Sequence, residues 1–414
     1  MEQLPEIKRK EALKLFFAVA AFSAIGLGLS DAVFANYFKE AYNVTAFQRG
    51  FIELPREIPG IICVFVVSAF AFLGDVRISI ISQALSAIGV LVLGLVTPPF
   101  GVMLIFLFIN SAGMHIFFPL QDSICMSLQA GQSVGTGLSK MKSFGLIFTM
   151  ITSVIVFFGF RSGFFTFTDR IISIFLFSVV AFCVALALLI RVDRLTRNRQ
   201  PSLHIKAQLV FKKKYNLYYI LSVCNGAQKQ IRIVYGPWVL IELLGKRADT
   251  FAILGIAAAL ACIFFTRFIG WMLDKYGVKI SILFQAVSFI TVYIAYALLS
   301  YGFYSGGLAK AGLAVAISYL VFVLDRTTQN LTMINAVYLR EIAETPADIT
   351  PSLTAGFALD HIVAIVCAFI GGIVWSRFGP HYVFIFTAAL SIINLIVSFK
   401  VKTGNAIEVY SRAG

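Results

Sequence analysis

The chain has 414 residues, of which 59% are hydrophobic and only 13% are charged, and its mean hydropathy is +0.89. One or two water-soluble cores could not bury this much apolar surface, so the composition excludes a soluble globular protein and predicts an all-α, polytopic membrane protein. The formal net charge of +14 could suggest a nucleic-acid partner, but the places of the basic residues along the chain argue against one.

Twelve apolar runs are each long enough to cross a bilayer, because a helix of about 20 residues spans a hydrocarbon core of ~30 Å. The predicted spans are, in chain order, 13–37, 47–73, 78–97, 101–124, 139–160, 170–191, 215–243, 249–273, 279–301, 311–337, 353–376 and 380–400. The longest polar segment, 191–214, has eight basic residues and one acid and divides the spans into six and six. We therefore predict an N-terminal six-helix half (1–190), a basic cytosolic linker (191–214) and a C-terminal six-helix half (215–414).

The loops between these spans alternate in charge. If the N-terminus is cytosolic, 21 of the 34 Lys and Arg residues lie in cytosolic segments and 8, Arg49 among them, lie in loops on the other side. An excess of Lys and Arg marks the cytosolic side of a membrane protein, so both termini are predicted to be cytosolic in a cell-membrane protein. This bias accounts for the high pI without a nucleic-acid partner.

The segment 270–279, GWMLDKYGVK, lies in the short loop between the eighth and ninth spans. Two glycines permit a tight turn and close helix approach, while an acid at a helix end can make charge-assisted bonds that exist in one conformation only. The equivalent loop between spans two and three, AFLGDVRIS, keeps an acid and a base but lacks the second glycine. We interpret both loops as a cytosolic gate formed by Asp75, Arg77, Gly270, Asp274, Lys275, Gly277 and Lys279.

The spacing G-x-x-x-D-[RK]-x-G-x-[RK] in the later loop resembles the loop signature of the major facilitator superfamily. With the six-plus-six arrangement, the resemblance covers essentially the whole chain. It implies two pseudo-symmetric six-helix halves, and it implies that the third helix of each triplet packs outside a central cavity. The sequence independently shows the same division, because spans three, six, nine and twelve contain essentially no charge whereas spans one, two, four, five, seven, ten and eleven do.

Ionisable groups inside spans are costly, at least ~2.5 kcal/mol at a helix centre, and are functional candidates by default. Cations among them can receive a carboxylate or phosphate, or they can neutralise Asp325, Asp31 or Asp360 in buried ion pairs; both interpretations stay open. The candidate substrate-binding residues are Arg56, His115, Gln228, Lys229, Arg232, Asp325, Arg326 and Asn330. Coupling to protons needs an acid or histidine beside a movable cation, and the candidates are Asp31, Glu57, Asp360 and His361.

These features predict a secondary active transporter for a small anionic or zwitterionic metabolite. It would work by alternating access as a monomer, with a proton or other ion gradient instead of a cofactor, and with only its substrate and the bilayer as partners. One alternative is multidrug efflux, which the absence of proline from the fifth span disfavours. A weaker one is transition-metal transport through His115, Asp360 and His361, with Met114, Asp122 and Met126 nearby in sequence. The chain has no H-E-x-x-H, G-x-S-x-G or phosphate-binding glycine loop, so an enzyme is not expected.

Overall fold

The computed structural model describes residues 5–128, 134–196 and 211–401, and every regular element in these ranges is a helix. The elements are α1 (Glu6–Asp31), α2 (Phe34–Tyr42), α3 (Ala46–Ala69), η1 (Ala71–Leu73), α4 (Asp75–Leu95), α5 (Phe100–Leu128), α6 (Val134–Arg161), α7 (Ser173–Thr196), η2 (Lys213–Tyr215), α8 (Asn216–Trp238), η3 (Val239–Leu243), α9 (Ala248–Tyr304), α10 (Leu313–Thr328), η4 (Gln329–Thr332), α11 (Met333–Ile342), α12 (Pro346–Phe378) and α13 (Pro380–Lys400). The prediction of an all-α chain is confirmed.

The helices correspond to the twelve predicted spans. Eight helical stretches in the described part of the chain are long and apolar enough to cross a membrane, and α9 alone covers two of the predicted spans. Within α9, Gly277 has a φ of 74°, which interrupts the helix where the sequence predicts a turn. The polar helices α3 and α8 and the short α10 complete the set of twelve, so the chain is a multi-pass membrane protein.

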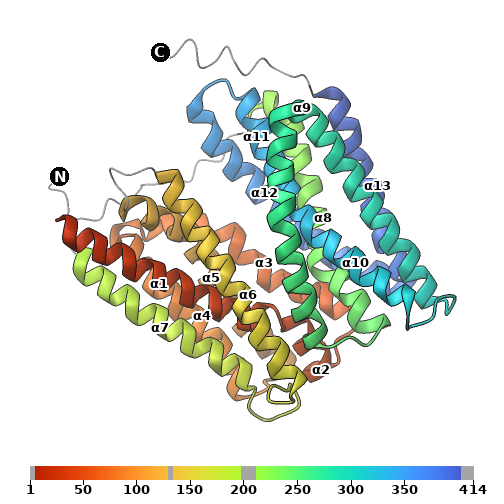
Figure 1. Ribbon diagram of the computed structural model, residues 1–414, viewed down its shortest axis with the longest axis horizontal. Helices are drawn as coiled ribbons and strands as arrows, with labels where there is room; N and C mark the ends of the chain where they lie inside the picture. Colours follow the sequence, from red (N-terminus) through yellow and green to blue (C-terminus); the bar gives the residue numbers. More distant parts are fainter. Residues whose placement is uncertain (1–4, 129–133, 197–210, 402–414) are drawn as a thin grey trace. The chain divides into compact units, whose positions relative to one another are not determined.

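The chain forms two compact units. The N-terminal unit comprises Met1–Asn43, Pro55–Ala207 and Arg247–Ile256. In it, α1 lies alongside α7 and α6, and α4 packs against α5 and α7 (Figure 1). Its core is built from apolar side chains of these helices, such as Phe16, Phe117 and Leu189.

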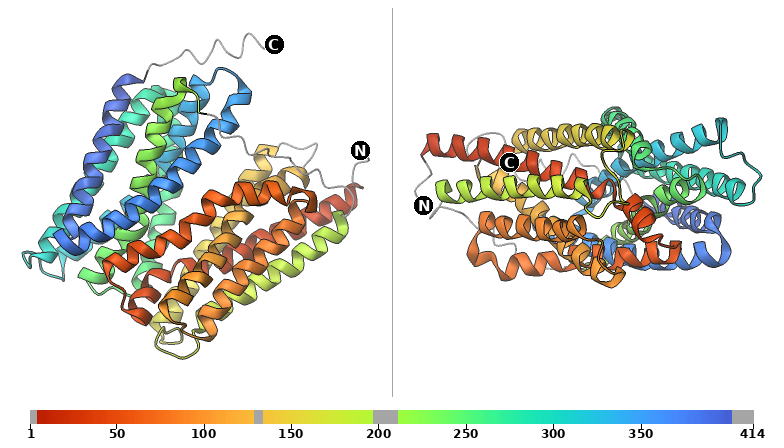
Figure 2. Two further views of the ribbon diagram at one scale, coloured as in Figure 1. Left: turned by 180° about the vertical axis from the view of Figure 1, so that it is seen from behind. Right: turned by 90° about the horizontal axis from the view of Figure 1, so that it is seen from below.

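The C-terminal unit comprises Val44–Leu54, Gln208–Lys246 and Ala257–Gly414. Here α8 packs against α12 and α13 (Figure 2). The division into two halves joined by a linker at 191–214 stays a prediction, because most of that linker, residues 197–210, lies outside the described residues.

Three predicted spans are broken inside the unit that holds them. In the first span, α1 ends at Asp31 and the chain becomes helical again at Phe34 as α2. In the seventh span, α8 contains Pro237 and continues into the π-helical segment η3. In the tenth, the 3₁₀ segment η4 separates α10 from α11 and contains Asn330. Broken helices expose backbone groups that ordinary helices satisfy internally, which is why they often line binding sites in transporters. The breaks in the first and tenth spans coincide with the candidate residues Asp31 and Asn330.

Candidate functional site

A charged pair joins α8 to α12 in the C-terminal unit. Lys229 Nζ lies 2.6 Å from Asp360 Oδ2, and Asn225 Nδ2 donates a hydrogen bond of 2.8 Å to Asp360 Oδ1. Asn225 and Lys229 are one helical turn apart and therefore share the face of α8 that meets α12. The Lys229 side chain is 18% exposed and that of Asp360 is 9% exposed, so the pair is largely withdrawn from solvent.

Two glycines allow the two helices to approach at this point. A Cβ placed on Gly226 of α8 would lie 2.4 Å from the Asp360 carbonyl oxygen, and one on Gly356 of α12 would lie 2.3 Å from the Tyr218 hydroxyl. A side chain at Gly226 would meet the backbone of α12 and displace that helix, whereas one at Gly356 would meet the side chains of Tyr218 and Ser222. The close backbone contact brings Lys229 within reach of Asp360.

A second charged group lies deeper in the same unit. Asp325 of α10 and Arg232 of α8 are each 1% exposed, and Arg232 and Arg326 lie close enough to Asp325 for their charges to interact with it. A Cβ on Gly236 would lie 3.1 Å from the Tyr296 hydroxyl and 3.3 Å from Asp325 Oδ2, so these two groups flank the same glycine. The structure therefore brings Arg232, Asp325 and Arg326 together.

The remaining candidates of this unit have different surroundings. Gln228 is fully buried; its amide donates to Ser391 Oγ at 2.8 Å and accepts from Asn394 Nδ2 at 3.4 Å, so it holds α8 to α13. His361 is buried, with its ring 4.4 Å from that of Phe357. Each of the two therefore takes part in packing, whatever further role it has.

In the N-terminal unit, Arg56 is the centre of a smaller group. Its Nη2 lies 2.5 Å from Asp31 Oδ1, and its guanidinium stands 5.6 Å from the centre of the Phe34 ring. The Arg56 carbonyl accepts a hydrogen bond from the Ser111 hydroxyl, which is also 3.1 Å from His115 Nδ1. Arg56, Asp31 and His115 are thus brought together, and Glu57 is buried on the next position of α3.

One buried ion pair was not expected from the sequence. The charge pattern counts Arg49 among the loop residues on the non-cytosolic side, but the structure has it in the first turn of α3, where its side chain is only 2% exposed and pairs with Glu53 one turn along the helix. Glu53 also accepts a hydrogen bond of 3.1 Å from Gln230 of α8. The i, i+4 spacing of opposite charges at the start of a span was the available signal.

The two predicted gate loops differ in their contacts. In the shorter loop, Asp75 accepts a hydrogen bond of 2.5 Å from Ser123, and Arg77 Nε lies 3.2 Å from Asp193 Oδ1. In the longer loop, Lys275 stands 4.9 Å from the centre of the Trp271 ring, while Asp274 and Lys279 are exposed. A Cβ on Gly270 would meet no atom within 4 Å, so this conformation shows no close helix approach there. The gate itself stays a prediction.

A further polar cluster ties the start of α8 to the start of α12. Lys212 Nζ lies 2.7 Å from Asp348 Oδ2, which also accepts a hydrogen bond of 2.9 Å from the Tyr215 hydroxyl; Lys214 Nζ lies 3.1 Å from Glu344 Oε1. The hydrogen bond from Lys212 lowers the pKa of Asp348, and the same bond raises the pKa of Lys212. From the sequence these lysines were expected only to belong to a basic linker.

A metal site finds no support in the described part of the chain, where no three His, Cys, Asp or Glu side chains gather in a group that could hold an ion. This applies to the weaker alternative of transition-metal transport through His115, Asp360 and His361.

No family model matches this sequence, and no curated protein matches it either. Solved structures do. The nucleoside transporter NupG superposes with a TM-score of 0.72 at 17% identity, covering 94% of this chain and 100% of that chain. A POT family transporter in complex with 5-aminolevulinic acid gives 0.71 at 12% identity, covering 97% and 96%. The inward-open xylose transporter XylE from E. coli gives 0.71 at 14% identity, covering 96% and 98%.

At these identities the similarity establishes the fold. The chain has the major facilitator fold, as its loop signature indicates, and the subfamily is not identified.

Proposed function

We propose that the protein is a secondary active transporter that moves a small polar metabolite by alternating access and couples this movement to protons. The observation that carries the proposal is the ion pair between Lys229 and Asp360, located inside two predicted membrane spans. Proteins of the same fold include transporters of nucleosides and xylose and one that binds 5-aminolevulinic acid, which supports transport as the general activity. An enzymatic activity is not proposed.

The ion pair suits proton coupling because its strength depends on a single proton. While Asp360 is ionised, its carboxylate holds the Lys229 ammonium at 2.6 Å and Asn225 adds a second bond. A proton on Asp360 removes the negative charge, which weakens the attraction and leaves the ammonium available to another anion. Protonation and substrate binding would therefore be linked through Lys229.

The same residue indicates the substrate class. A substrate carboxylate can replace Asp360 as the partner of Lys229, which keeps enough exposure, 18%, to be reached. The group of Arg232, Asp325 and Arg326 adds charges of both signs in the same unit. A small anionic or zwitterionic metabolite fits this set, and 5-aminolevulinic acid, the ligand of one solved structure with this fold, carries both an amino and a carboxyl group.

The remaining features of the proposal follow from this mechanism. The energy source is a proton or other ion gradient, with no cofactor, and the partners are the substrate and the lipid bilayer. The protein works as a monomer in the cell membrane. Both of its termini lie in the cytosol, as the distribution of Lys and Arg predicts.

Uptake into proteoliposomes under an imposed proton gradient tests the proposal. The probes are 5-aminolevulinate, uridine, xylose and, for the alternative of drug efflux, tetraphenylphosphonium. We expect accumulation of 5-aminolevulinate that collapses when a protonophore is added. Transport of tetraphenylphosphonium alone would overturn the proposal. Uptake of uridine or xylose that is the same with and without the proton gradient would also overturn it.

The Asp360→Asn variant separates coupling from binding. Since asparagine cannot exchange a proton, gradient-driven uptake should be lost while counterflow exchange of the same probe persists. The matched control is Asp169→Asn, because Asp169 is an exposed loop carboxylate. Loss of both activities in Asp360→Asn would show that the carboxylate binds substrate or maintains the fold, and coupling through it would be wrong.

A further inference from the structure

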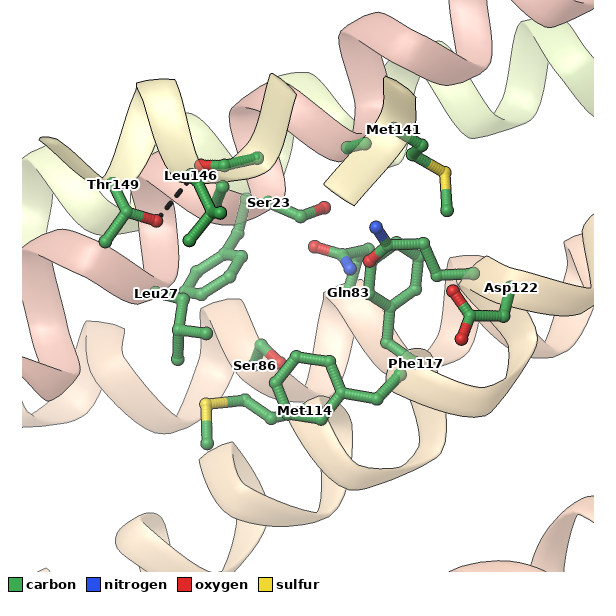
Figure 3. A pocket seen from close by; sticks show the side chains of 16 residues that line it. Ser23, Leu27, Gln83, Ser86, Met114, Phe117, Asp122, Met141, Leu146 and Thr149 are labelled. Carbon is green, nitrogen blue, oxygen red and sulfur yellow. Dashed lines mark hydrogen bonds between the residues drawn. The ribbon is translucent and has the colours of Figure 1, made fainter. Parts of the chain in front are cut away.

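The N-terminal unit contains a cavity of about 530 Å³ between α1, α4, α5, α6 and α7 (Figure 3). None of the candidate substrate-binding, coupling or gate residues lines it. A volume of this size is typical of pockets that hold small organic molecules, which range from about 300 to 1,000 Å³. The cavity is therefore a potential binding site that the transport mechanism proposed above does not use.

Two buried polar groups of this cavity lack hydrogen-bond partners among the described residues. They are Oε1 of Gln83, a side chain that is 1% exposed, and the hydroxyl of Ser23, which is 7% exposed. Both side chains point into the cavity (Figure 3). By contrast, the Thr149 hydroxyl on the opposite wall bonds to the Gly145 carbonyl at 3.1 Å. Buried polar groups in proteins are nearly always paired, so Gln83 and Ser23 together indicate an absent partner.

The rest of the lining determines what kind of partner fits. Leu27, Met114, Phe117 and Leu146 give the cavity apolar and aromatic walls, and Asp122 is the one charged residue among the described side chains that line it. Among the side chains that the structure describes, no lysine, arginine or histidine lines the cavity to hold an anion. Asp122 already takes part in another interaction. These walls favour an uncharged molecule with an apolar body.

We propose that this cavity binds an uncharged amphipathic small molecule. Its ring or hydrocarbon part packs against Met114 and Phe117, and its head group both donates and accepts hydrogen bonds, to Gln83 and Ser23. An amide or hydroxyl head group meets this requirement, because the Gln83 amide and the Ser23 hydroxyl can each act as donor and acceptor. This ligand differs in charge from the metabolite proposed above, and its binding does not depend on transport.

Three probes of matched shape and different charge test the ligand class: 2-naphthamide, 2-naphthoate and 2-naphthylmethylamine. Binding of each to the full-length protein in nanodiscs is measured by equilibrium dialysis, and partition into empty nanodiscs is subtracted. We expect saturable binding of 2-naphthamide at one site and at least tenfold weaker binding of both charged probes. Equal or tighter binding of the amine or the carboxylate would overturn the proposal.

The Gln83→Leu variant tests the site. Leucine keeps a similar volume but loses the amide, so the affinity for 2-naphthamide should fall at least tenfold. The variant should stay folded, since Gln83 Oε1 makes no hydrogen bond to any of the described residues that could be lost. The matched control is Gln285→Leu, because Gln285 of α9 is equally buried, its amide atoms also lack partners, and it does not line the cavity. Unchanged affinity in Gln83→Leu, or equal losses in both variants, would refute the assignment.

An uncharged amphiphile can reach the cavity from water or from the membrane. Nanodiscs doped with diacylglycerol distinguish these sources: competition with 2-naphthamide at the unmodified site assigns the site to a neutral lipid, and unaffected binding assigns it to a soluble molecule. Because the readout is binding, the result stands whether or not the protein couples transport to protons.

Discussion

The Lys229 ammonium lies 2.6 Å from the Asp360 carboxylate, and the backbones of their helices meet one turn away at Gly226. The residue that brings the helices together is thus separate from the residues that carry charge. Packing and charge can therefore be altered independently, and the first two predictions use this separation.

Removing one member of the ion pair should cost more than removing both. We expect Lys229→Gln or Asp360→Asn alone to lower the free energy of unfolding by about 1–3 kcal/mol, because each leaves an uncompensated charge. This is less than the ~3–5 kcal/mol of a fully buried pair, since Lys229 keeps some contact with solvent. The double variant should be more stable than either single one, as thermal unfolding in nanodiscs would reveal. A double variant whose loss equals the sum of the two would show that the residues do not interact.

The contact at Gly226 should tolerate no side chain. A methyl group there would lie 2.4 Å from the Asp360 carbonyl and push α12 away, so we expect Gly226→Ala to lose about 1–3 kcal/mol of stability. The control is Gly101→Ala in α5, where an added Cβ meets nothing within 4 Å and should be neutral or stabilise by up to ~1 kcal/mol. Thermal midpoints of the two variants test the contact, and equal midpoints would argue against it.

Gly277 and Gly270 of the later gate loop should respond differently to alanine. The φ of 74° at Gly277 strains any other residue, so Gly277→Ala should lose about 1–2 kcal/mol of stability. Gly270 is helical with open space around it, so Gly270→Ala should fold at least as well as the unmodified protein.

If Gly270 permits close helix approach in another conformation, Gly270→Ala should nevertheless slow transport several-fold. Proteoliposome uptake and thermal unfolding, measured on the same preparations, separate the two effects. Normal transport by Gly270→Ala would remove this glycine from the gate.

The contact between Lys212 and Asp348 should be sensitive to acid. Because the hydrogen bond from Lys212 lowers the pKa of Asp348, the carboxylate stabilises the fold above its ordinary pKa of about 3.9, and this stabilisation is lost as the pH falls through the lowered value. Lys212, whose pKa is raised, stays charged throughout this range. The difference in thermal midpoint between the unmodified protein and Asp348→Asn should therefore be constant from about pH 5 to 9, begin to shrink near pH 4, and disappear only once the pH has fallen below the lowered pKa of Asp348.

The exposed carboxylate of Asp169 provides the control for this measurement, and Asp169→Asn should match the unmodified protein at every pH. A difference between Asp348→Asn and the unmodified protein that does not shrink at all as the pH falls from about 5 toward about 2 would mean that the side chain acts through packing and not through its charge.

Much of the fold could be predicted from local sequence. Each predicted span has a helical counterpart, and Gly277 adopts the left-handed conformation expected of a tight turn. Hydropathy succeeds here because the backbone of a spanning segment must satisfy its own hydrogen bonds, whatever lies next to it. Hydropathy did not predict the short 3₁₀ break at Gln329–Thr332, because this polar segment lies within a single predicted span.

Which charged residues pair with one another could not be predicted from the sequence. The sequence placed Lys229 near the middle of a span but left open whether it receives substrate or pairs with Asp31, Asp325 or Asp360, and it put Arg49 in a loop although this residue is buried beside Glu53.

The amino-acid sequence by itself determined which segments cross the membrane and which of them carry charge, because both depend on side chains counted along one helix. Only the tertiary structure decided that Lys229 meets Asp360 and that Gln83 and Ser23 face one cavity. Those relationships depend on how each helix is rotated about its axis and how closely it approaches its neighbours, and small residues such as Gly226 fix that approach through contacts distant in sequence.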